Sequence, residues 1–283
     1  MIVIINLNHC IGEIMIISKP FLKWAGNKNK LVPIINPLLG DGDRLVEPFT
    51  GSGAVFMATD FPKYLLCDVN ADLIGLFNNL KYNPSAVITE ITQLFDGTNN
   101  NETKYYELRT EFNSLQPTDI RKSALFVYLN RHAFNGLCRY NSKGGFNVPF
   151  GKYKTVYFPI DELQAFAQKC VLAEFHVMDF NDCLDLAVSS DVVYCDPPYV
   201  PLTPTANFTS YTADGFGMDK QQQLADAANR LTSKNIRVIV SNHDTAVSRA
   251  LYANASITAI DVRRSISSKG ATRGMAKELI AVF

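Results

Sequence analysis

The segment "RLVEPFTGSGAVFMATDFPKYLLCD" (residues 44–68) decides the fold class of this chain. Apolar runs at 44–49 and 64–68 have the length of buried strands, and the small and apolar residues at 53–60 between them are typical of a helix. A strand, a helix and a second strand in this order form a βαβ unit, which requires a parallel sheet. We therefore predict an α/β protein.

The first of these strands runs into a glycine-rich turn, "EPFTGSG" (47–53), and Asp68 ends the second strand. Glycines at such a turn let a ligand approach the free backbone N–H groups, and a carboxylate at a strand end can accept both hydroxyls of a ribose. The pattern predicts a nucleoside site at the carboxyl ends of the strands. A dinucleotide oxidoreductase remains an alternative, although Phe56 replaces the third glycine of G-x-G-x-x-G.

Further strand signals follow only after a long segment of different character. The later runs lie at 174–179, 191–196, 236–242, 256–262 and 278–283, with a helix expected at 219–234. Residues 70–118 instead read as amphipathic helices, one of them beginning with Asn83 as cap and Pro84 at its first position. A helix at 118–132 and a hairpin or ordered loop at 134–153 follow, so an insertion interrupts the sheet.

The sharpest signal is the segment "DVVYCDPPY" (191–199), in which a strand ends in a carboxylate, two prolines and a tyrosine. An amine that attacks an electrophile needs acceptors for its hydrogens and a flat surface against its ring. Asp196 and the Pro197 carbonyl are such acceptors, Tyr199 is such a surface, and the rigid Pro197 and Pro198 hold them in place. The alternative is a strand-end turn with a half-buried tyrosine.

Charge is balanced overall but not along the chain. The 27 basic and 27 acidic residues give a formal net charge of zero. Residues 121–160 nevertheless contain seven Lys or Arg and no acid, whereas residues 170–219 contain eight acids and no Lys or Arg. This pattern predicts one region that meets a polyanion and another that holds a cationic ligand.

The basic segment interleaves cations with aromatic rings. Its members are Arg131, Arg139, Lys143, Lys152 and Lys154 among Phe134, Tyr140, Phe146, Phe150 and Tyr153. Basic side chains neutralise phosphates, aromatic rings stack on bases, and Arg and Asn read base edges. We predict that this segment binds nucleic acid and contacts base edges. The alternative is a solvated loop with a small aromatic core. A second basic stretch, 263–274, is rich in Ser and Gly and suits phosphate contacts, with a plain solvated loop equally open.

The remaining features point to a reduced, cytoplasmic protein. The six cysteines have no metal-finger spacing, several lie in apolar runs, and Cys195 is assigned to the core. The apolar N-terminus contains Glu13 and does not reach the roughly 18 uninterrupted apolar residues of a membrane span. Trp24 is expected in a ligand wall, and His243 is expected to be a hydrogen-bonded structural residue.

Eight blocks of the sequence, in this order, resemble the Dam-type DNA adenine methyltransferases, which methylate adenine within GATC. They are FLKWAGNK (21–28), EPFTGSGAVF (47–56), YLLCDVN (64–70), NRHAFNGLCRYNSKGGFNVPFGKY (130–153), VVYCDPPY (192–199), ANFTSY (206–211), SNHD (241–244) and VRRSISS (262–268). The resemblance extends from about residue 19 to residue 283. Two positions depart from the family pattern: Asn27 replaces a usual glycine, and Lys152 stands where Arg is frequent.

The resemblance implies a Rossmann-like S-adenosylmethionine-dependent methyltransferase sheet, interrupted by a mainly helical target-recognition domain with a β-hairpin. The expected parts are an N-terminal extension (1–18), a catalytic domain in two pieces (19–70 and 159–283) and the target-recognition domain (71–158). It also implies transfer of a methyl group from S-adenosylmethionine to the exocyclic amino group of adenine in double-stranded DNA. The base would leave the duplex, and the transfer would be direct and in line, by a monomer with no metal and no membrane attachment.

The resemblance also implies roles for individual residues. The expected catalytic residues are Asp196, Pro197, Pro198 and Tyr199. The expected cofactor contacts are Trp24, Lys28, Phe49, Gly51, Ser52, Gly53, Asp68, Asp179, Phe180 and Asp196. The expected DNA contacts are Lys23, Arg131, Phe134, Asn135, Leu137, Arg139, Asn141, Lys152 and Tyr153. Two rival functions stay open: a methyltransferase of the same fold acting on RNA or a protein amide, and a catalytically silent DNA-binding regulator.

Overall fold

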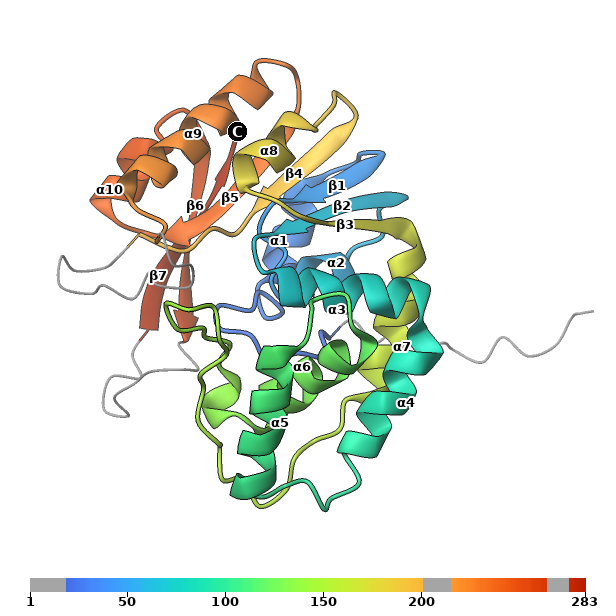
Figure 1. Cartoon of the computed structure of the whole chain (residues 1–283). Coiled ribbons are helices and arrows are strands. Elements are labelled where there is room, and N and C mark those ends of the chain that lie inside the picture. Colours follow the sequence, from blue (N-terminus) through green and yellow to red (C-terminus); the bar gives the residue numbers. More distant parts are fainter. Residues whose placement is uncertain (1–18, 201–214, 264–274) are drawn as a thin grey trace, which may run out of the picture.

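The computed structural model describes residues 19–200, 215–263 and 275–283. The expected N-terminal extension, the 206–211 block and most of the basic stretch 263–274 lie outside the described residues. Within the described part, seven strands form one sheet in the order β3-β2-β1-β4-β5-β7-β6 (Figure 1). Their bounds are β1 Arg44–Glu47, β2 Lys63–Asp68, β3 Ala173–Val177, β4 Asp191–Cys195, β5 Arg237–His243, β6 Ser256–Arg263 and β7 Met275–Val282.

The strand pairing confirms the expected parallel sheet. Strands β3, β2, β1, β4 and β5 are parallel neighbours, whereas β7 runs antiparallel to both β5 and β6. The short helix α2 (Ala54–Ala58) connects β1 to β2 and completes the predicted βαβ unit. The carboxyl ends of the five parallel strands therefore meet along one edge of the sheet.

Helices cover both faces of the sheet, as a parallel sheet requires. Figure 1 shows α8 (Phe180–Asp185), α9 (Met218–Thr232) and α10 (Ala246–Leu251) on one face, and α1 (Val32–Leu39), α2 and α3 (Ala71–Tyr82) on the other. Neighbouring strand residues point into different cores: Leu45 packs with the α1–α3 side and Val46 with the α9 side. This alternation is why the strands read as continuous apolar runs.

The segment between β2 and β3 is mainly helical, as expected. After α3 it contains α4 (Pro84–Leu94), α5 (Glu102–Ser114), α6 (Ile120–His132) and, before β3, α7 (Ile160–Lys169) and the short 3₁₀ turn η2 (Cys170–Leu172). Pro84 begins α4, which confirms its predicted place, but Asn83 makes no side-chain capping bond. The predicted hairpin contains the 3₁₀ turn η1 (Phe134–Gly136) and two isolated bridges, Ala133 to Phe150 and Tyr140 to Phe146, in place of a continuous ladder.

The insertion shares its core with one face of the sheet. Phe77 of α3 lies 5.4 Å from Phe175 of β3, measured between ring centroids, and the same buried cluster continues to Tyr105 of α5 and Tyr128 of α6. Helix α3 therefore packs against both the sheet and the inserted helices. The division into domains at residue 71 stays a prediction. Among the helices of the described ranges, none has the length and apolar character to cross a membrane.

Candidate active site

The N-terminal segment that contains Trp24 packs against the glycine-rich turn after β1. A β-carbon on Gly51 would lie 2.9 Å from Nε1 of Trp24, and Gly51 has a φ of +50°. Close packing and left-handed backbone geometry therefore both require glycine here. The Nδ2 atom of Asn27 donates to Oγ of Ser52 at 3.1 Å, and Gly53, with a φ of +70°, precedes α2. The structure thus brings Trp24, Gly51, Ser52 and Gly53 together.

Asp68 joins the end of β2 to the same turn. Its Oδ2 accepts the Gly51 N–H at 3.0 Å, and its Oδ1 accepts the Asn70 N–H at 2.9 Å. Burial raises the pKa of Asp68, and the hydrogen bonds from Asn70 and Gly51 oppose this rise. A carboxylate has about four lone-pair sites in total. The Gly51 and Asn70 N–H groups use two of these sites, which leaves acceptor capacity for hydroxyl groups of a ligand.

Asp196 directly follows β4 and forms an ion pair with Lys28. The Nζ atom of Lys28 lies 2.9 Å from Oδ1 of Asp196, and it also donates to the Gly26 carbonyl at 2.6 Å. The same ammonium lies 4.7 Å from the centroid of the Tyr199 ring. Burial raises the pKa of Asp196, whereas the charge of Lys28 lowers it. A cation therefore faces both the acceptor and the aromatic surface predicted for the target amine.

Several polar side chains hold the Asp-Pro-Pro-Tyr turn. The Tyr199 hydroxyl donates to Oε2 of Glu278 on β7 at 3.1 Å, and its ring meets the His243 ring edge to face with centroids 4.8 Å apart. Gln221 of α9 donates to the Pro198 carbonyl at 2.7 Å, and Asn242 of β5 accepts the Val200 N–H at 3.0 Å. The turn is thereby tied to two strands and a helix.

Sequence reasoning did not identify Gln221, Asn242 and Glu278 as parts of this site. Only Asn242 carried a local signal, because it lies in the block 241–244 at a strand end. The neighbouring His243 was expected to be structural, and its Nδ1 indeed lies 2.7 Å from the Val200 carbonyl oxygen.

Aromatic rings line the strand ends on the β3 side. Phe49 and Phe180 stack with centroids 5.4 Å apart and an interplanar angle of 24°, and Phe216 contacts Phe49 edge to face at 5.6 Å. Asp179 caps α8 through the Asn181 N–H and forms a 3.2 Å ion pair with Lys220. The predicted Phe49, Asp179 and Phe180 therefore lie together, and Phe216 and Lys220 are additions that the sequence did not indicate.

Three of the predicted DNA contacts, Lys23, Asn135 and Tyr153, are linked through the Tyr153 side chain, and Phe134 precedes Asn135 in the chain. The Asn135 N–H donates to the Tyr153 hydroxyl at 2.9 Å, and Nζ of Lys23 lies 4.5 Å from the centroid of the Tyr153 ring. Phe134 is 50% exposed, which is unusual for a large apolar ring. Buried Asn130 of α6 accepts the Lys23 N–H and donates to the Lys23 carbonyl, so it attaches the segment that contains Lys23 to α6.

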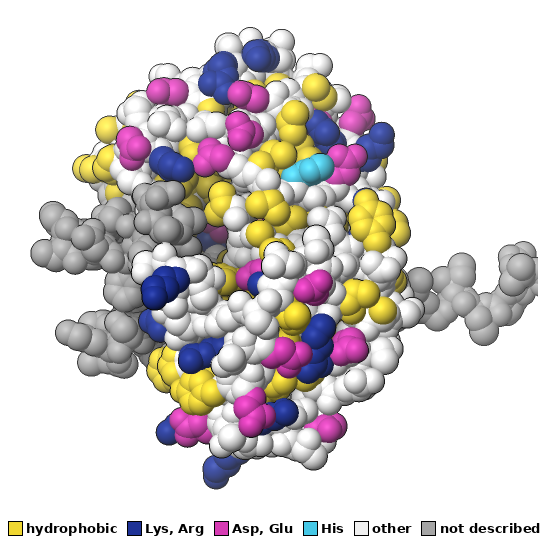
Figure 2. Space-filling model, in the orientation of Figure 1, with side chains coloured by type: hydrophobic (Ala, Val, Ile, Leu, Met, Phe, Trp, Pro, Cys, Tyr) yellow, Lys and Arg dark blue, Asp and Glu magenta, His cyan; other side chains and the backbone are white. Residues whose placement is uncertain are grey.

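The rest of the hairpin presents polar and basic side chains to solvent. Exposed Arg139 donates to Oδ1 of Asn147 across the hairpin at 2.8 Å. Asn141 closes the tip by accepting the N–H groups of Lys143 and Gly145, and Lys152 is 73% exposed and 3.9 Å from Glu102. Leu137 packs partly buried against the core. Figure 2 shows a hollow between the sheet and the helical insertion, with acidic and basic side chains at its bottom.

Arg131 is placed differently from our expectation. Only 8% of it is exposed, Nη2 donates to the Phe21 carbonyl, and the guanidinium lies 5.4 Å from the centroid of the Tyr157 ring. Burial lowers the pKa of Arg131. Two further cations of the basic segment also have internal partners: Arg121 pairs with Glu111 and Glu90, and Lys122 pairs with Asp72. Arg131 and Lys122 are buried and do not contribute to an exposed basic surface, and the charge of partly exposed Arg121 is neutralised by its two glutamates. A DNA contact by Arg131 is not supported.

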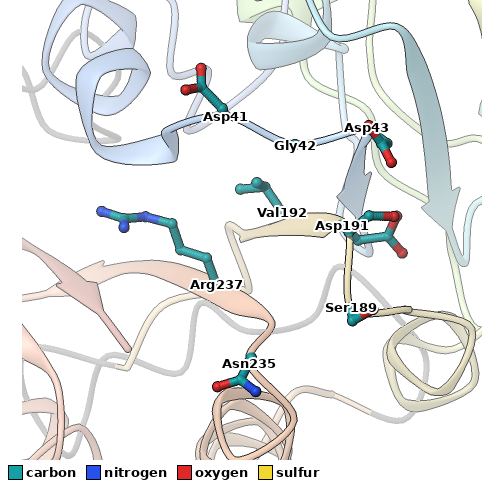
Figure 3. Close-up of a pocket in the computed structure, with 9 residues that line it drawn as sticks. Asp41, Gly42, Asp43, Ser189, Asp191, Val192, Asn235 and Arg237 are labelled. Carbon is teal, nitrogen blue, oxygen red and sulfur yellow. The ribbon is translucent and has the colours of Figure 1, made fainter.

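A cavity of about 430 Å³ lies at the opposite edge of the sheet, at the amino ends of β4 and β5 (Figure 3). It is lined by Asp41, Gly42, Asp43, Ser189, Ser190, Asp191, Val192, Asn235 and Arg237. Arg237 donates to the Leu38 carbonyl at 2.8 Å, and Asp191 forms a 2.7 Å ion pair with Arg44. The cavity is therefore separate from the residues that gather at the carboxyl ends. In the described ranges, no three His, Cys, Asp or Glu side chains gather in a way that could hold a metal ion.

A sheet in this order, with a glycine-rich turn after β1, an acid ending β2 and Asp-Pro-Pro-Tyr after β4, defines a Rossmann-like methyltransferase fold. The family model for D12 class N6 adenine-specific DNA methyltransferases matches residues 24–266, and the chain belongs to this family. Membership confirms the predicted enzyme class, and it excludes the dinucleotide oxidoreductase.

Curated relatives agree with this family over nearly the whole chain. A DNA adenine methylase from Salmonella typhi is 48% identical over 266 residues, which are 94% of this chain and 95% of that protein. One from Vibrio cholerae is 48% identical over 267 residues, covering 94% and 96%. One from Escherichia coli K12 is 46% identical over 266 residues, covering 94% and 95%. The resemblance to Dam-type enzymes is confirmed.

Proposed function

We propose that this DNA adenine methyltransferase acts on double-stranded DNA at GATC sites and takes the methyl group from S-adenosylmethionine, the donor that its family implies. The supporting observation is the position of the Lys28 ammonium, 2.9 Å from Asp196 and over the Tyr199 ring. A nitrogen that carries hydrogens therefore already lies close to both this carboxylate and this aromatic ring. The exocyclic amino group of adenine has the same requirements: acceptors for its hydrogens and a flat surface for its ring.

The residues at the carboxyl ends of β1, β2 and β3 fit such a cofactor. The N–H groups of Gly51 and Gly53 are bonded to Asp68 and Thr50, so they are not the free donors that the sequence predicted. The turn, with Trp24 packed against it and Lys28 in the neighbouring segment, would instead hold the amino-acid part through its side chains. Asp68 would accept ribose hydroxyls. Phe49 and Phe180, with Asp179, would hold the adenine ring of the cofactor, with Ser52 beside the turn. When bound, this cofactor supplies a methyl group on a positively charged sulfur, a leaving group that allows direct transfer to nitrogen.

The side chains of the catalytic turn would orient the target adenine. Its amino group is hydrogen-bonded inside the duplex, so the base must first leave the stack. Asp196 and the Pro197 carbonyl would then accept the amino hydrogens and direct the nitrogen lone pair, while Tyr199 stacks on the ring. Pro198 restricts the backbone and is itself fixed by Gln221. The Lys28 ammonium must leave its position over Tyr199 to admit the base.

Recognition of the site would come from the hairpin and the segment before Trp24. Lys23, Leu137, Arg139 and Tyr153 would contact base edges, and Asn141 and Lys152 would contact the backbone. Phe134, which is 50% exposed, and Asn135, which has a φ of +53°, would occupy or support the space around the flipped base. Arg131 would not contact the DNA, because it is buried and donates to the Phe21 carbonyl.

The decisive experiment supplies labelled S-adenosylmethionine with duplexes that differ only at one GATC site. We expect label in adenine of the duplex that contains the site, and background label in the scrambled duplex, in RNA of the same sequence and in protein. The Asp196→Ala variant is the matched negative control. Equal labelling of both duplexes would refute GATC specificity, and stronger labelling of RNA or of protein amides would favour the rival substrates.

We further propose that the protein is a monomer that works in the cytoplasm without a metal. The cysteines of the described ranges are free thiols, which supports a reducing compartment. The roles proposed for Asp196 and Tyr199 need no metal ion. Unchanged methylation in the presence of a chelator and a single monomeric species in sedimentation would support this part, and a loss of activity that added metal restores would contradict it.

A further inference from the structure

The hairpin is attached to the start of α3 on both sides of Arg139. On one side, the Tyr140 hydroxyl donates to Oδ2 of Asp72 at 2.9 Å. On the other, Nδ2 of Asn70 lies 3.8 Å from Sγ of Cys138. Arg139 itself is exposed and donates to Asn147 across the hairpin. The base-reading candidate is therefore the residue between two anchor points.

The Asp72 anchor is rigid because its carboxylate has a second buried partner. Nζ of Lys122 on α6 lies 3.0 Å from Oδ1 of Asp72, and about a tenth of each of these side chains is exposed. Lys122 also donates to the Leu115 carbonyl at 2.9 Å. A carboxylate held by a cation that is itself held has little freedom to follow the hairpin. The position of Asp72 is therefore fixed by α6, and the hydrogen bond from Tyr140 holds the hairpin in place relative to it.

The Tyr140 hydroxyl is the polar link between this carboxylate and the hairpin. Its ring packs edge to face on Phe146, with centroids 5.9 Å apart, opposite it in the hairpin bridge. Burial raises the pKa of Tyr140 well above its ordinary value, and the neighbouring Cys138 and Asp72 act in the same direction. The hydroxyl therefore stays protonated and remains a hydrogen-bond donor throughout the working pH range.

The residues around this anchor also reach the cofactor side of the molecule. The Asn70 side chain caps α3 by accepting the Leu73 N–H at 3.1 Å, and the Asn70 N–H donates to Asp68. Because the position of α3 is set by the end of β2, the hairpin is held relative to the sheet and not only relative to the inserted helices. The hairpin that carries Arg139 is therefore held in a defined position relative to the catalytic turn.

We propose that Tyr140 and Asp72 are positioning residues for site discrimination: their hydrogen bond fixes the hairpin so that the Arg139 guanidinium meets one particular base pair. The inference rests on the proposed function, because it assumes that Arg139 reads a base edge. Loss of the hydroxyl leaves the aromatic packing and all exposed charges unchanged, yet it frees the segment that carries Arg139. A fixed guanidinium discriminates between bases by geometry, and a mobile one acts mainly as a charge.

The test compares methylation rates on the GATC duplex with rates on duplexes in which one base pair of the site is changed. The variants are Tyr140→Phe, Arg139→Ala, the double variant and, as control, Tyr82→Phe, which removes a hydroxyl from a 69% exposed tyrosine of α3. We expect Tyr140→Phe to lower the ratio of kcat/KM values about tenfold at the same base pair that Arg139→Ala affects, and to leave the other ratios unchanged. Adding Tyr140→Phe to Arg139→Ala should lower the ratio no further.

Three results would overturn the inference. The first is an unchanged ratio in Tyr140→Phe, and the second is an equal loss of the ratio at every base pair. The third is a double variant whose ratio is lower than that of Arg139→Ala by the same factor by which Tyr140→Phe is lower than wild type. Thermal unfolding of each variant shows whether the fold is retained. Failure of the proposed function is separately visible, because wild-type protein would then methylate all duplexes alike. The Tyr82→Phe control should match wild type at every duplex.

Discussion

The Nζ atom of Lys28 lies 2.9 Å from Oδ1 of Asp196, although 168 positions separate the two residues in the chain. The lysine side chain is 6% exposed and the aspartate side chain 22% exposed, so the pair is largely withdrawn from water. Removing one partner of such a pair leaves an uncompensated buried charge, which is costly. Asp196 therefore contributes both to the proposed chemistry and to the stability of the site.

We expect Asp196→Ala to lower methyl transfer by orders of magnitude and to leave duplex binding largely unchanged. The carboxylate would contact the reacting amine, whereas it contacts no phosphate in the proposed complex. The same change should lower the free energy of unfolding by about 3 kcal/mol, because Lys28 stays buried without its partner. Methylation assays, duplex binding and urea unfolding measure the three effects. Activity within tenfold of wild type would contradict the assignment.

A second prediction concerns Asp68. We expect Asp68→Ala to weaken S-adenosylmethionine binding by about tenfold or more, because a charged acceptor of about 1.5–3 kcal/mol per hydrogen bond is lost. The Gly51 N–H also loses its acceptor, so the turn should loosen while the fold is retained. Calorimetric titration measures the dissociation constant. Asp43→Ala, at the opposite edge of the sheet, is the control and should bind as wild type does; a wild-type value for Asp68→Ala would rule out the ribose role.

Exposed cations of the hairpin should divide into two kinds. Arg139→Ala should cost about 1–3 kcal/mol of discrimination at one base pair of the site. Lys152→Ala should instead weaken binding to all sequences about equally and lower the salt slope by about one unit. Lys269 and Arg273, predicted to act as Lys152 does, lie outside the described residues. Binding to single-substitution duplexes at several salt concentrations separates the two kinds, and a uniform effect of Arg139→Ala would reduce the hairpin to an electrostatic anchor.

Arg131 should behave as a structural residue. We expect Arg131→Met to lower the free energy of unfolding by about 1–3 kcal/mol, because the Phe21 carbonyl loses a charged donor and the Tyr157 ring loses its cation. The salt slope of DNA binding should stay at the wild-type value, since the side chain is 8% exposed. A slope lower by about one unit would show instead that Arg131 reaches a phosphate in the complex.

Glu47 should make stability depend on pH. Burial raises the pKa of Glu47 from 4.5 to about 8, the charge of Asp196 adds to this rise, and Lys169 opposes it. The Oε1 atom of Glu47 has no hydrogen-bond partner among the described residues. The folded state therefore binds this proton more tightly than the unfolded state. Its stabilising contribution is complete below pH 4.5 and is lost as the pH rises toward 8, by at most about 1.4 kcal/mol per pH unit.

Replacing Glu47 with Gln should remove this dependence, because the amide has no proton to lose. Urea unfolding of wild type and Glu47→Gln between pH 5 and pH 8 measures it, and the variant should gain relative stability as the pH rises. Parallel curves for the two proteins would show that the glutamate is ionised in the folded state over this range.

Local sequence patterns determined the strands, the βαβ unit and the chemistry of the strand ends. The runs at 44–49 and 64–68, the Asp-Pro-Pro-Tyr turn and the glycines at 51 and 53 act through backbone geometry and burial within a few neighbouring residues, which spacing along the chain reveals. The structure confirms these strands. The prediction that the glycine-rich turn binds a ligand likewise used only neighbouring residues.

Only the tertiary structure decided which side chains meet and which cations face solvent. Tyr199 donates a hydrogen bond to Glu278, which is 79 positions away in the chain, and Tyr140 donates one to Asp72, which is 68 positions away. Arg131 and Arg139 lie in the same basic segment, yet one is buried against Phe21 and the other is exposed. Both residues carry the same charge in the same basic segment, so charge alone does not predict which of them is buried. Arg131 is buried because α6 packs its side chain into the core, and that packing depends on segments far away in the sequence.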